Sequence, residues 1–370
     1  MFADAYLEPL IVFSILSAGV ILNRQRTPQN NGTWSPTSSS SSEGLLSSPI
    51  LEPQYRERKF FGRKVQSRNT ARWKRTLVSR LLRKFPFLVE VWYWLLVYWT
   101  YQLGRAFTAV TLKSDTVVQA RLHALSLVRL EQKLGIFLEP AIQGYFLPRS
   151  VLLTAINRIY SFIHIPGTIT FIAWLYHYAP ASLFESRRRA LAVCNLIAFV
   201  IFTAWPCMPP RLLSEEDGFG FIDTVHTGKV ASVWTTNRFC NQLAAMPSLH
   251  FGYSFVIGLT IATMPPSLSL HANNLRRRIL LIIFGISYPL TILVAIIATA
   301  NHYILDAVAG LFVALLGWQI NSVLYNLLVL EDWVYYLLRV HKPSRDYEAE
   351  GAQIYAVDKE GGDEDWWRKA

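Results

Sequence analysis

Six long apolar segments constrain the fold of this chain more than any other feature of its sequence. Each is close to the length that an α-helix needs to cross ~30 Å of hydrocarbon. Only 16% of the 370 residues are charged, whereas about 25% is usual in soluble domains. The sequence therefore predicts an all-α, polytopic membrane bundle over residues 85–329, with a six-helix core. The six segments cover residues 85–104, 151–178, 190–205, 248–264, 279–299 and 303–329.

The rest of the chain divides into three further regions. Residues 1–23 are expected to form an N-terminal signal anchor. The apolar run 10–22 is short for a span, so a re-entrant or interfacial segment is the alternative. Residues 24–84 join a Ser-rich linker, whose composition predicts disorder, to a basic cytosolic segment. Residues 330–370 are expected to form an acidic cytosolic tail.

Positive charge is concentrated in residues 56–84, which carry roughly the whole net charge of +11. Because this stretch directly precedes an aromatic-rich apolar segment, we attribute it to the cytosolic membrane surface rather than to nucleic-acid binding. Arginine triplets at 187–189 and 276–278 fall on the same side if every span crosses once. The other span ends therefore share the non-cytosolic face, at residues 206–211, 247–250 and 301–306.

Between the first two spans, residues 117–147 place apolar residues at helical spacing with basic residues among them. This pattern predicts an amphipathic helix that lies on the membrane rather than crossing it. The three cysteines are too few for a disulfide scaffold. A single disulfide between Cys207 and Cys240, or two free thiols at these positions, are both compatible with the sequence.

Ionisable residues at the ends of apolar helices are costly and indicate function. His302 and Asp306 are spaced i,i+4, so on a helix the carboxylate can hydrogen-bond one imidazole nitrogen and leave the other as a nucleophile. His250 and His302 both lie at expected helix starts, where free N–H groups favour a phosphate. Arg211 can clamp a phosphate, and the Ser248 hydroxyl can donate to one.

Each of these residues also has a structural interpretation when it is taken alone. A histidine at a helix end can be a structural hydrogen-bonding residue, Ser248 a helix start and Arg211 an interfacial anchor. Their convergence on one membrane face from three segments favours a site. Asn157, Tyr160 and His164 could line a headgroup pocket, but hydrogen bonding between helices is the preferred interpretation for them.

Three motifs follow one another along the chain: Pro-Pro-Arg at 209–211, Pro-Ser-Leu-His at 247–250 and His-x-x-x-Asp at 302–306. In this order they resemble the type 2 phosphatidic acid phosphatase superfamily. Leu249, where the lipid phosphatases usually have Gly, is more similar to the inositol phosphorylceramide synthase branch, which transfers phosphoinositol.

Two positions depart from the pattern of the superfamily's phosphatases. The Lys that they carry several residues before the first motif is absent, since the chain reads Phe202, Thr203 and Ala204 there. Ala295 and Ile296 stand where the phosphatases carry Ser-Arg. Both departures weaken a phosphatidate-phosphatase assignment more than they weaken a transferase.

The resemblance implies a reaction in two steps. His302 would attack phosphorus to form a phosphohistidine, with Asp306 holding its ring. His250 would protonate the leaving lipid alkoxide and then act as base on the incoming hydroxyl. Arg211 and Ser248 would bind the phosphoryl oxygens, and the reaction would need no metal or other cofactor.

Three functions are compatible with these residues. The leading one is transfer of a phosphorylated headgroup, such as phosphoinositol, from a glycerolipid to a lipid alcohol such as ceramide. The second is hydrolysis of a lipid or prenyl phosphate by the same triad, and the third is a non-catalytic lipid-binding membrane protein. Lipids are the expected partners, nucleic acid is not expected, and the sequence leaves protein partners unknown. The expected location is the Golgi or ER membrane, with the site on the lumenal side.

Overall fold

The computed structural model describes residues 2–25, 54–111, 114–225, 242–264 and 275–343. The chain divides into two compact units. The first includes Met1–Gly19 and Val91–Ser322, and the second Val20–Glu90 and Val323–Arg345. The predicted Ser-rich linker and most of the predicted acidic tail lie outside the described residues.

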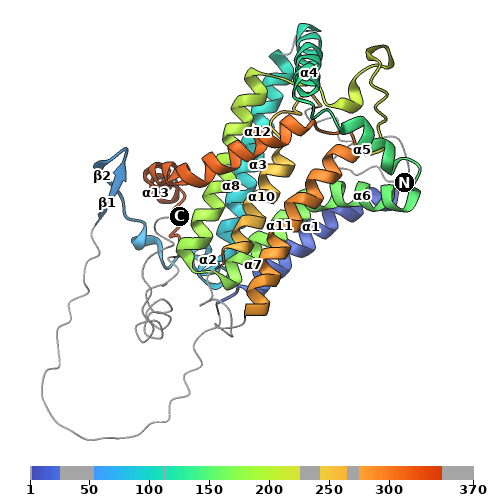
Figure 1. Ribbon diagram of the computed structural model, residues 1–370. Coiled ribbons are helices and arrows are strands. Elements are labelled where there is room, and N and C mark those ends of the chain that lie inside the picture. The colour runs from blue at the N-terminus through green and yellow to red at the C-terminus, as the bar shows by residue number, and fades with distance from the viewer. Residues whose placement is uncertain (1, 26–53, 112–113, 226–241, 265–274, 344–370) are drawn as a thin grey trace, which may run out of the picture. The chain divides into compact units, whose positions relative to one another are not determined.

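The described residues of the first unit are mostly helical, as predicted (Figure 1). A π-helical turn at Ile163–Gly167, which contains Pro166, separates α6 from α7. Both α1 and α3 extend across the boundary between the two units. The helices are α1 (Phe2–Leu22), α3 (Phe87–Thr111), α4 (Ser114–Leu134), α5 (Glu139–Phe146), α6 (Ser150–Phe162), α7 (Thr168–Tyr178), α8 (Ala181–Ala204), α10 (Leu249–Ala262), α11 (Leu275–Ala298) and α12 (Ile304–Ile320).

A core of six membrane-spanning helices is not confirmed in the described part of the chain. By length and composition, the helical runs Leu275–Ala298 and Ile304–Leu337 can cross a membrane, and the bent pair α6 and α7 makes a third span if it counts as one. The apolar helix Leu249–Ala262 has 14 residues. At 1.5 Å per residue it covers roughly 21 Å, which is less than the ~30 Å of hydrocarbon.

Glycine residues bring α10 and its neighbours into backbone contact. A Cβ on Gly258 of α10 would lie 2.2 Å from the Gly285 carbonyl oxygen of α11, and one on Gly310 of α12 would lie 2.3 Å from the Ser248 carbonyl oxygen. Small residues of this kind let membrane helices approach closely. As a result α10 packs against α8, α11 and α12, as Figure 1 shows. This packing sets the start of α10 beside the start of α12.

The predicted amphipathic segment 117–147 is two helices, α4 and α5, rather than one. The break follows Leu134, because Gly135 has a φ of +71° that a helix cannot contain. One face of α4 is buried against the loops that join the later helices. This cluster includes Ala120, Ala124, Leu127, Val128, Cys207, Met208, Ala245 and Tyr303.

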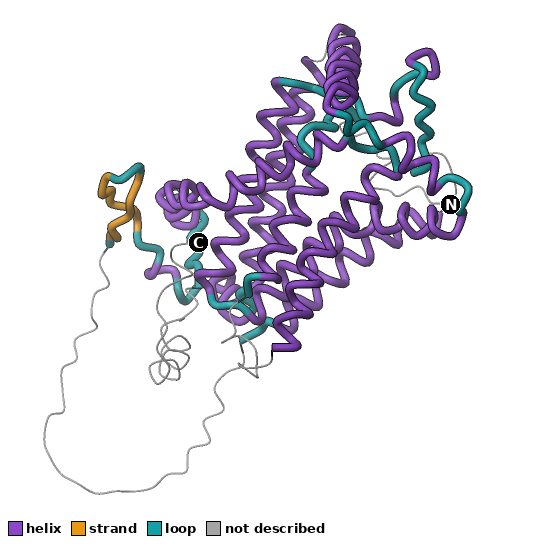
Figure 2. Tube along the Cα trace, in the orientation of Figure 1, coloured by secondary structure: helices purple, strands orange, loops and turns teal. Residues whose placement is uncertain are grey.

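The second unit contains the only strands of the described residues, an antiparallel hairpin of β1 (Tyr55–Phe60) and β2 (Arg63–Arg68), shown in orange in Figure 2. It also holds α2 (Leu77–Lys84) and α13 (Leu328–Leu337). Asp332 of α13 joins the hairpin, since it accepts hydrogen bonds from Arg58 Nε at 2.8 Å and Ser67 Oγ at 2.6 Å. The basic segment of the sequence is therefore folded, with part of its charge neutralised within the unit.

Candidate active site

The two histidines singled out in the sequence lie together. His250 stands in the first turn of α10, and His302 in the short turn that joins α11 to α12. His302 Nε2 is 3.3 Å from His250 Nδ1. The first-turn contact between α10 and α12 produces this pairing, because the Ser248 N–H donates to the Asp306 carbonyl at 2.9 Å. Segments 52 residues apart in the chain thus meet at one point.

The ring of His302 is held through Nδ1. This atom lies 2.7 Å from the Ala245 carbonyl oxygen and 3.5 Å from Asp306 Oδ2. A carbonyl oxygen can only accept, so Nδ1 carries the hydrogen and a neutral ring keeps its lone pair at Nε2. The nucleophilic nitrogen expected from the sequence therefore faces His250. The shorter contact that selects it comes from Ala245 rather than from Asp306.

Asp306 is completely buried in the first turn of α12. Its Oδ2 accepts a hydrogen bond from the Tyr303 N–H at 2.9 Å. An acidic side chain at the third helical position that reaches back to the cap residue is half of a capping box and stabilises the helix start. Asp306 thus has two partners, the backbone of its own helix and the His302 ring. The sequence pattern predicted the second of them.

Two further carboxylates, from Glu131 of α4 and Glu139 of α5, reach the same helix start. Both side chains are completely buried. Glu139 Oε1 accepts from the Ile304 N–H and Glu131 Oε1 from the Leu305 N–H, each at 2.8 Å. Burial, with a smaller contribution from the neighbouring Glu139, raises the pKa of Glu131 to about 9. The α12 N–H groups that were expected to bind phosphate are therefore occupied by protein carboxyl groups.

Neither glutamate was predicted from the sequence to belong to the site. A signal was present for Glu131, because it follows Ala124 and Leu127 at helical spacing on the buried face of α4, and acidic residues are seldom buried without a partner. Their partners are backbone N–H groups more than 160 residues away. Backbone groups have no residue type that a sequence motif can reveal.

Arg211 is held beside the turn that carries His302. Its Nε donates to Asn301 Oδ1 at 2.9 Å, its Nη2 donates to Gln242 Oε1, and its backbone N–H donates to the Ala300 carbonyl at 2.9 Å. Asn301 is itself held by Thr299, with Nδ2 2.9 Å from Oγ1. The guanidinium group thus hydrogen-bonds the residue that directly precedes His302. Sequence reasoning did not identify Asn301.

Ser248 is buried and caps α10, since its Oγ accepts from the Phe251 N–H at 3.3 Å. Ser248 therefore caps the start of α10, which is the structural role that the sequence allowed for it. Its hydroxyl hydrogen is a donor that this bond does not use. Cys207 is buried with a free thiol, and Cys240 lies outside the described residues. Among the described residues, no group of three or more His, Cys, Asp or Glu side chains is arranged to hold a metal ion.

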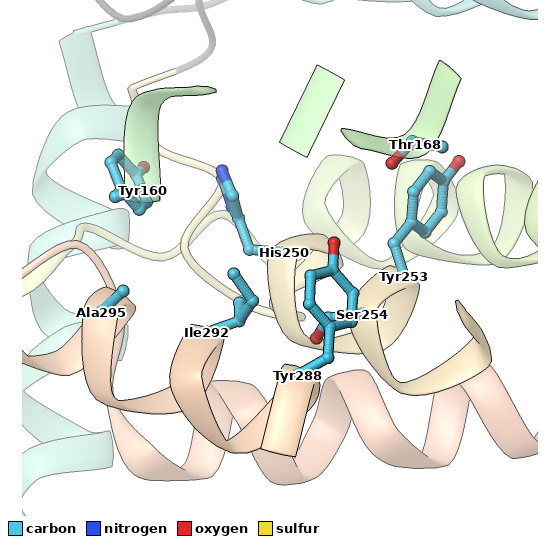
Figure 3. Close-up of a pocket in the computed structure, with 8 residues that line it drawn as sticks. All are labelled: Tyr160, Thr168, His250, Tyr253, Ser254, Tyr288, Ile292 and Ala295. Atoms are coloured by element: carbon cyan, nitrogen blue, oxygen red, sulfur yellow. The ribbon is translucent and has the colours of Figure 1, made fainter. Parts of the chain in front are cut away.

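A small pocket opens beside His250 (Figure 3). The His250 ring stacks on Tyr160 of α6, with ring centroids 4.7 Å apart and an interplanar angle of 25°. Hydroxyl-bearing side chains contribute much of the wall. The lining residues are Tyr160, Thr168, His250, Tyr253, Ser254, Tyr288, Ile292 and Ala295.

Of the three residues considered for a headgroup pocket, Tyr160 lines this one. Asn157 instead binds the long loop, with its Nδ2 donating to the Thr224 carbonyl at 2.9 Å. The side chain of His164 lies outside the described residues.

The family model of the PAP2 superfamily matches residues 125–320. This chain belongs to the PAP2 superfamily. The match begins in α4 and ends with α12, so it contains both histidines, Asp306, Arg211 and Ser248, and both buried glutamates. The superfamily resemblance of the sequence motifs is confirmed at this level.

Members of the PAP2 superfamily are typically lipid phosphatases and phosphotransferases, and the apolar helices agree with a membrane enzyme of this kind. No curated protein matches the chain. No solved structure matches it either.

Proposed function

We propose that this PAP2-superfamily protein transfers a phosphorylated headgroup, such as phosphoinositol, from a glycerolipid to a lipid alcohol such as ceramide. The observation that carries the proposal is the pairing of the two rings. With its Nδ1–H donated to the Ala245 carbonyl, His302 presents a lone pair at Nε2 to the second histidine, His250. A fixed nucleophile beside an acid–base group is the arrangement that covalent phosphoryl transfer requires.

In the first step, His302 Nε2 attacks phosphorus and the bond from phosphorus to the donor's alkoxide oxygen breaks. A protonated His250 gives its proton to this leaving oxygen, so the donor departs as a neutral alcohol. In the second step, the acceptor hydroxyl attacks the phosphohistidine, neutral His250 takes the hydroxyl proton, and the N–P bond breaks. Both histidines return to their starting states. At 3.3 Å the two rings leave no space for phosphorus, so they separate when substrate enters.

Phosphoryl oxygens would be bound by Arg211 and Ser248. Arg211 offers a charged, planar donor group next to the His302 turn, and such groups bind phosphate oxygens strongly. The Ser248 hydroxyl hydrogen and the start of α10 offer neutral donors. By contrast, the start of α12 offers few donors, because three carboxyl groups already occupy its backbone N–H groups.

We place the acceptor hydroxyl in the pocket beside His250. This pocket lies between α10, α11 and the α6–α7 bend, and it combines hydroxyl groups with apolar residues. Its hydroxyl groups can hydrogen-bond the acceptor, which is a lipid alcohol in the proposed transfer and water in hydrolysis. Hydrolysis of a lipid or prenyl phosphate is the alternative.

We further propose that the protein resides in the Golgi or ER membrane with this site on the lumenal side.

The test is a product analysis with the purified protein in lipid nanodiscs. Phosphatidylinositol labelled in its inositol ring is supplied with and without ceramide, and the labelled products are separated. Labelled inositol phosphorylceramide that forms only with ceramide supports transfer. Labelled inositol phosphate formed without regard to ceramide indicates hydrolysis. If neither forms, and lipid phosphates are not hydrolysed, the protein is a lipid-binding member of the superfamily and the proposal is wrong.

A pair of variants checks the acceptor pocket within the same assay. Tyr288→Phe removes one hydroxyl from the pocket wall and leaves the ring in place. We expect the yield of inositol phosphorylceramide to fall relative to inositol phosphate, because the acceptor binds less well while attack on the donor is unchanged. Tyr178→Phe, at an exposed position at the end of α7, is the matched control and should leave the product ratio unchanged.

A further inference from the structure

The start of α12 is held by an unusual set of groups. Three consecutive backbone N–H groups, from Tyr303, Ile304 and Leu305, donate to the carboxyl groups of Asp306, Glu139 and Glu131 respectively. Unpaired N–H groups at a helix start are commonly satisfied by one capping side chain and by water. Here each carboxyl group comes from a different helix, so α4 and α5 are both tied to the turn that carries His302.

The second oxygens of the two glutamates indicate their protonation state. Glu131 Oε2 and Glu139 Oε2 are both buried and have no hydrogen-bond partner among the described residues. Their Oε1 atoms bind neighbouring N–H groups, so the two carboxyl groups lie side by side. Two charged carboxylates in that position would repel each other without solvent to screen them. One proton placed between the two Oε2 atoms removes one charge and gives both oxygens a partner.

We propose that Glu131 and Glu139 share one proton and act as positioning residues for His302. Neither touches the reacting atoms. The singly protonated pair fixes the first turn of α12, and this turn sets the His302 ring against the Ala245 carbonyl. This inference rests on the proposed function in one respect, because the kinetic test measures the proposed reaction.

The shared proton makes the orientation of His302 depend on pH. Other groups that face Glu131 and titrate are Asp306, Cys207 and Tyr303, and each of them adds negative charge when it ionises. Loss of the shared proton therefore leaves two carboxylates beside Asp306 with no positive group among these neighbours. Repulsion then opens the start of α12, and His302 loses its fixed orientation. Activity should decline as the pH rises through the pKa of Glu131, which is about 9.

The test compares Glu131→Gln with Glu131→Ala. Gln accepts from the Leu305 N–H and donates to Glu139 at every pH, so it reproduces the protonated carboxyl. We expect Glu131→Gln to keep kcat near the wild-type value at pH 7 and to lose the alkaline decline. Glu131→Ala should lower kcat by about 100-fold, the size of loss that a small misplacement of a catalytic group causes, with little change in KM. Glu216→Gln, at an exposed site, is the matched control.

A second measurement does not depend on turnover. The ¹⁵N signals of His302 report which ring nitrogen carries hydrogen. In the wild type and in Glu131→Gln they should show the Nδ1–H form at pH 7, and in Glu131→Ala a mixture of forms. Between pH 8 and 10 the wild type should become mixed and Glu131→Gln should not. Thermal unfolding of each variant separates a loss of positioning from a loss of folding.

The possible outcomes separate the two proposals. If the wild-type protein forms neither inositol phosphorylceramide nor inositol phosphate, the proposed function is wrong. The ¹⁵N signals of His302 then still show whether the glutamates position its ring. If Glu131→Gln behaves like Glu131→Ala, or declines at alkaline pH like the wild type, the shared proton is wrong. If Glu131→Ala keeps the wild-type rate and the Nδ1–H form, Glu131 does not position His302.

Discussion

The chemistry of the site depends on one carbonyl group. A ring nitrogen 2.7 Å from the Ala245 oxygen must carry hydrogen, and this contact leaves the lone pair of His302 on Nε2, the nitrogen that attacks phosphorus in the proposed reaction. Asp306 stands at 3.5 Å from the same nitrogen and has the Tyr303 N–H as a closer partner. The ring is thus oriented by two acceptors, of which the carbonyl is the nearer.

His302→Ala should abolish turnover, because it removes the nucleophile. Asp306→Asn should cost much less than the ~10⁴-fold loss that follows when the carboxylate orienting a catalytic histidine is neutralised. The Ala245 carbonyl still selects the ring form, and the Asn oxygen can still accept from Tyr303. Initial rates of both variants in the nanodisc assay measure the difference. Equal, complete losses would show that Asp306 alone orients the ring.

A substitution at Ala300 tests whether the backbone of the turn that carries His302 is strained. It has a φ of +52°, a conformation that costs roughly 1–2 kcal/mol for a residue with a Cβ. Ala300→Gly relieves this strain and loses one buried methyl group. Ala298→Gly loses a buried methyl group within α11 and relieves nothing. We expect Ala300→Gly to be more stable than Ala298→Gly by about 2–3 kcal/mol in thermal unfolding, because a glycine within α11 also costs about 1 kcal/mol in helix propensity. If the two variants are equally stable, the turn is not strained.

Residue types at the site could be predicted from the sequence, but their partners could not. His250, His302, Asp306, Arg211 and Ser248 were found because ionisable or hydroxyl side chains at the ends of apolar helices stand out. The groups that hold them include the Ala245 carbonyl and the amide of Asn301. These are backbone or common polar groups, and only the folded chain shows which of them face the site.

At the scale of helices, close contacts at glycine residues bring the helices of the site together. Gly310 lets α12 approach the first turn of α10, where the Ser248 carbonyl lies. The apolar periodicity of the sequence predicted where helices occur, yet it could not predict this contact. It also did not show the break between α4 and α5, which depends on one glycine with positive φ. Helix packing determines the first feature and the backbone conformation of Gly135 the second, and hydropathy reports neither.

Gly310→Ala should separate His250 from His302. The added Cβ would lie 2.3 Å from the Ser248 oxygen, so α12 must move away from α10. We expect a destabilisation of about 1–3 kcal/mol, as for other overpacked cores, together with a large loss of activity. Gly144→Ala is the matched control, because a Cβ at Gly144 of α5 meets nothing within 4 Å. Retained activity in Gly310→Ala would show that the contact does not position the site.

At the scale of the whole molecule, the site and the arginine triplets lie at opposite ends of the same helices. His302 precedes the start of α12, whereas Arg187 and Arg189 pack near its other end, against Trp318 and Asn321. Likewise, α11 begins with the exposed arginines at 276–278 and ends just before the His302 turn. The charge pattern alone predicted this opposition, because a helix that crosses a membrane must place its two ends on opposite sides.

A glycosylation assay shows which of the two sides is lumenal. Basic residues favour the cytosol, so the loop after α8 should face the lumen. The tripeptide Asn-Ser-Thr, inserted after Glu216 in an exposed turn, should therefore carry glycan in a eukaryotic host. The natural sequon at Asn31 lies outside the described residues and is expected on the cytosolic side, so it should stay unmodified. A mobility shift that endoglycosidase removes reports each site. Glycan at Asn31 and none at the insertion would place the histidines on the cytosolic face and contradict the proposed lumenal site.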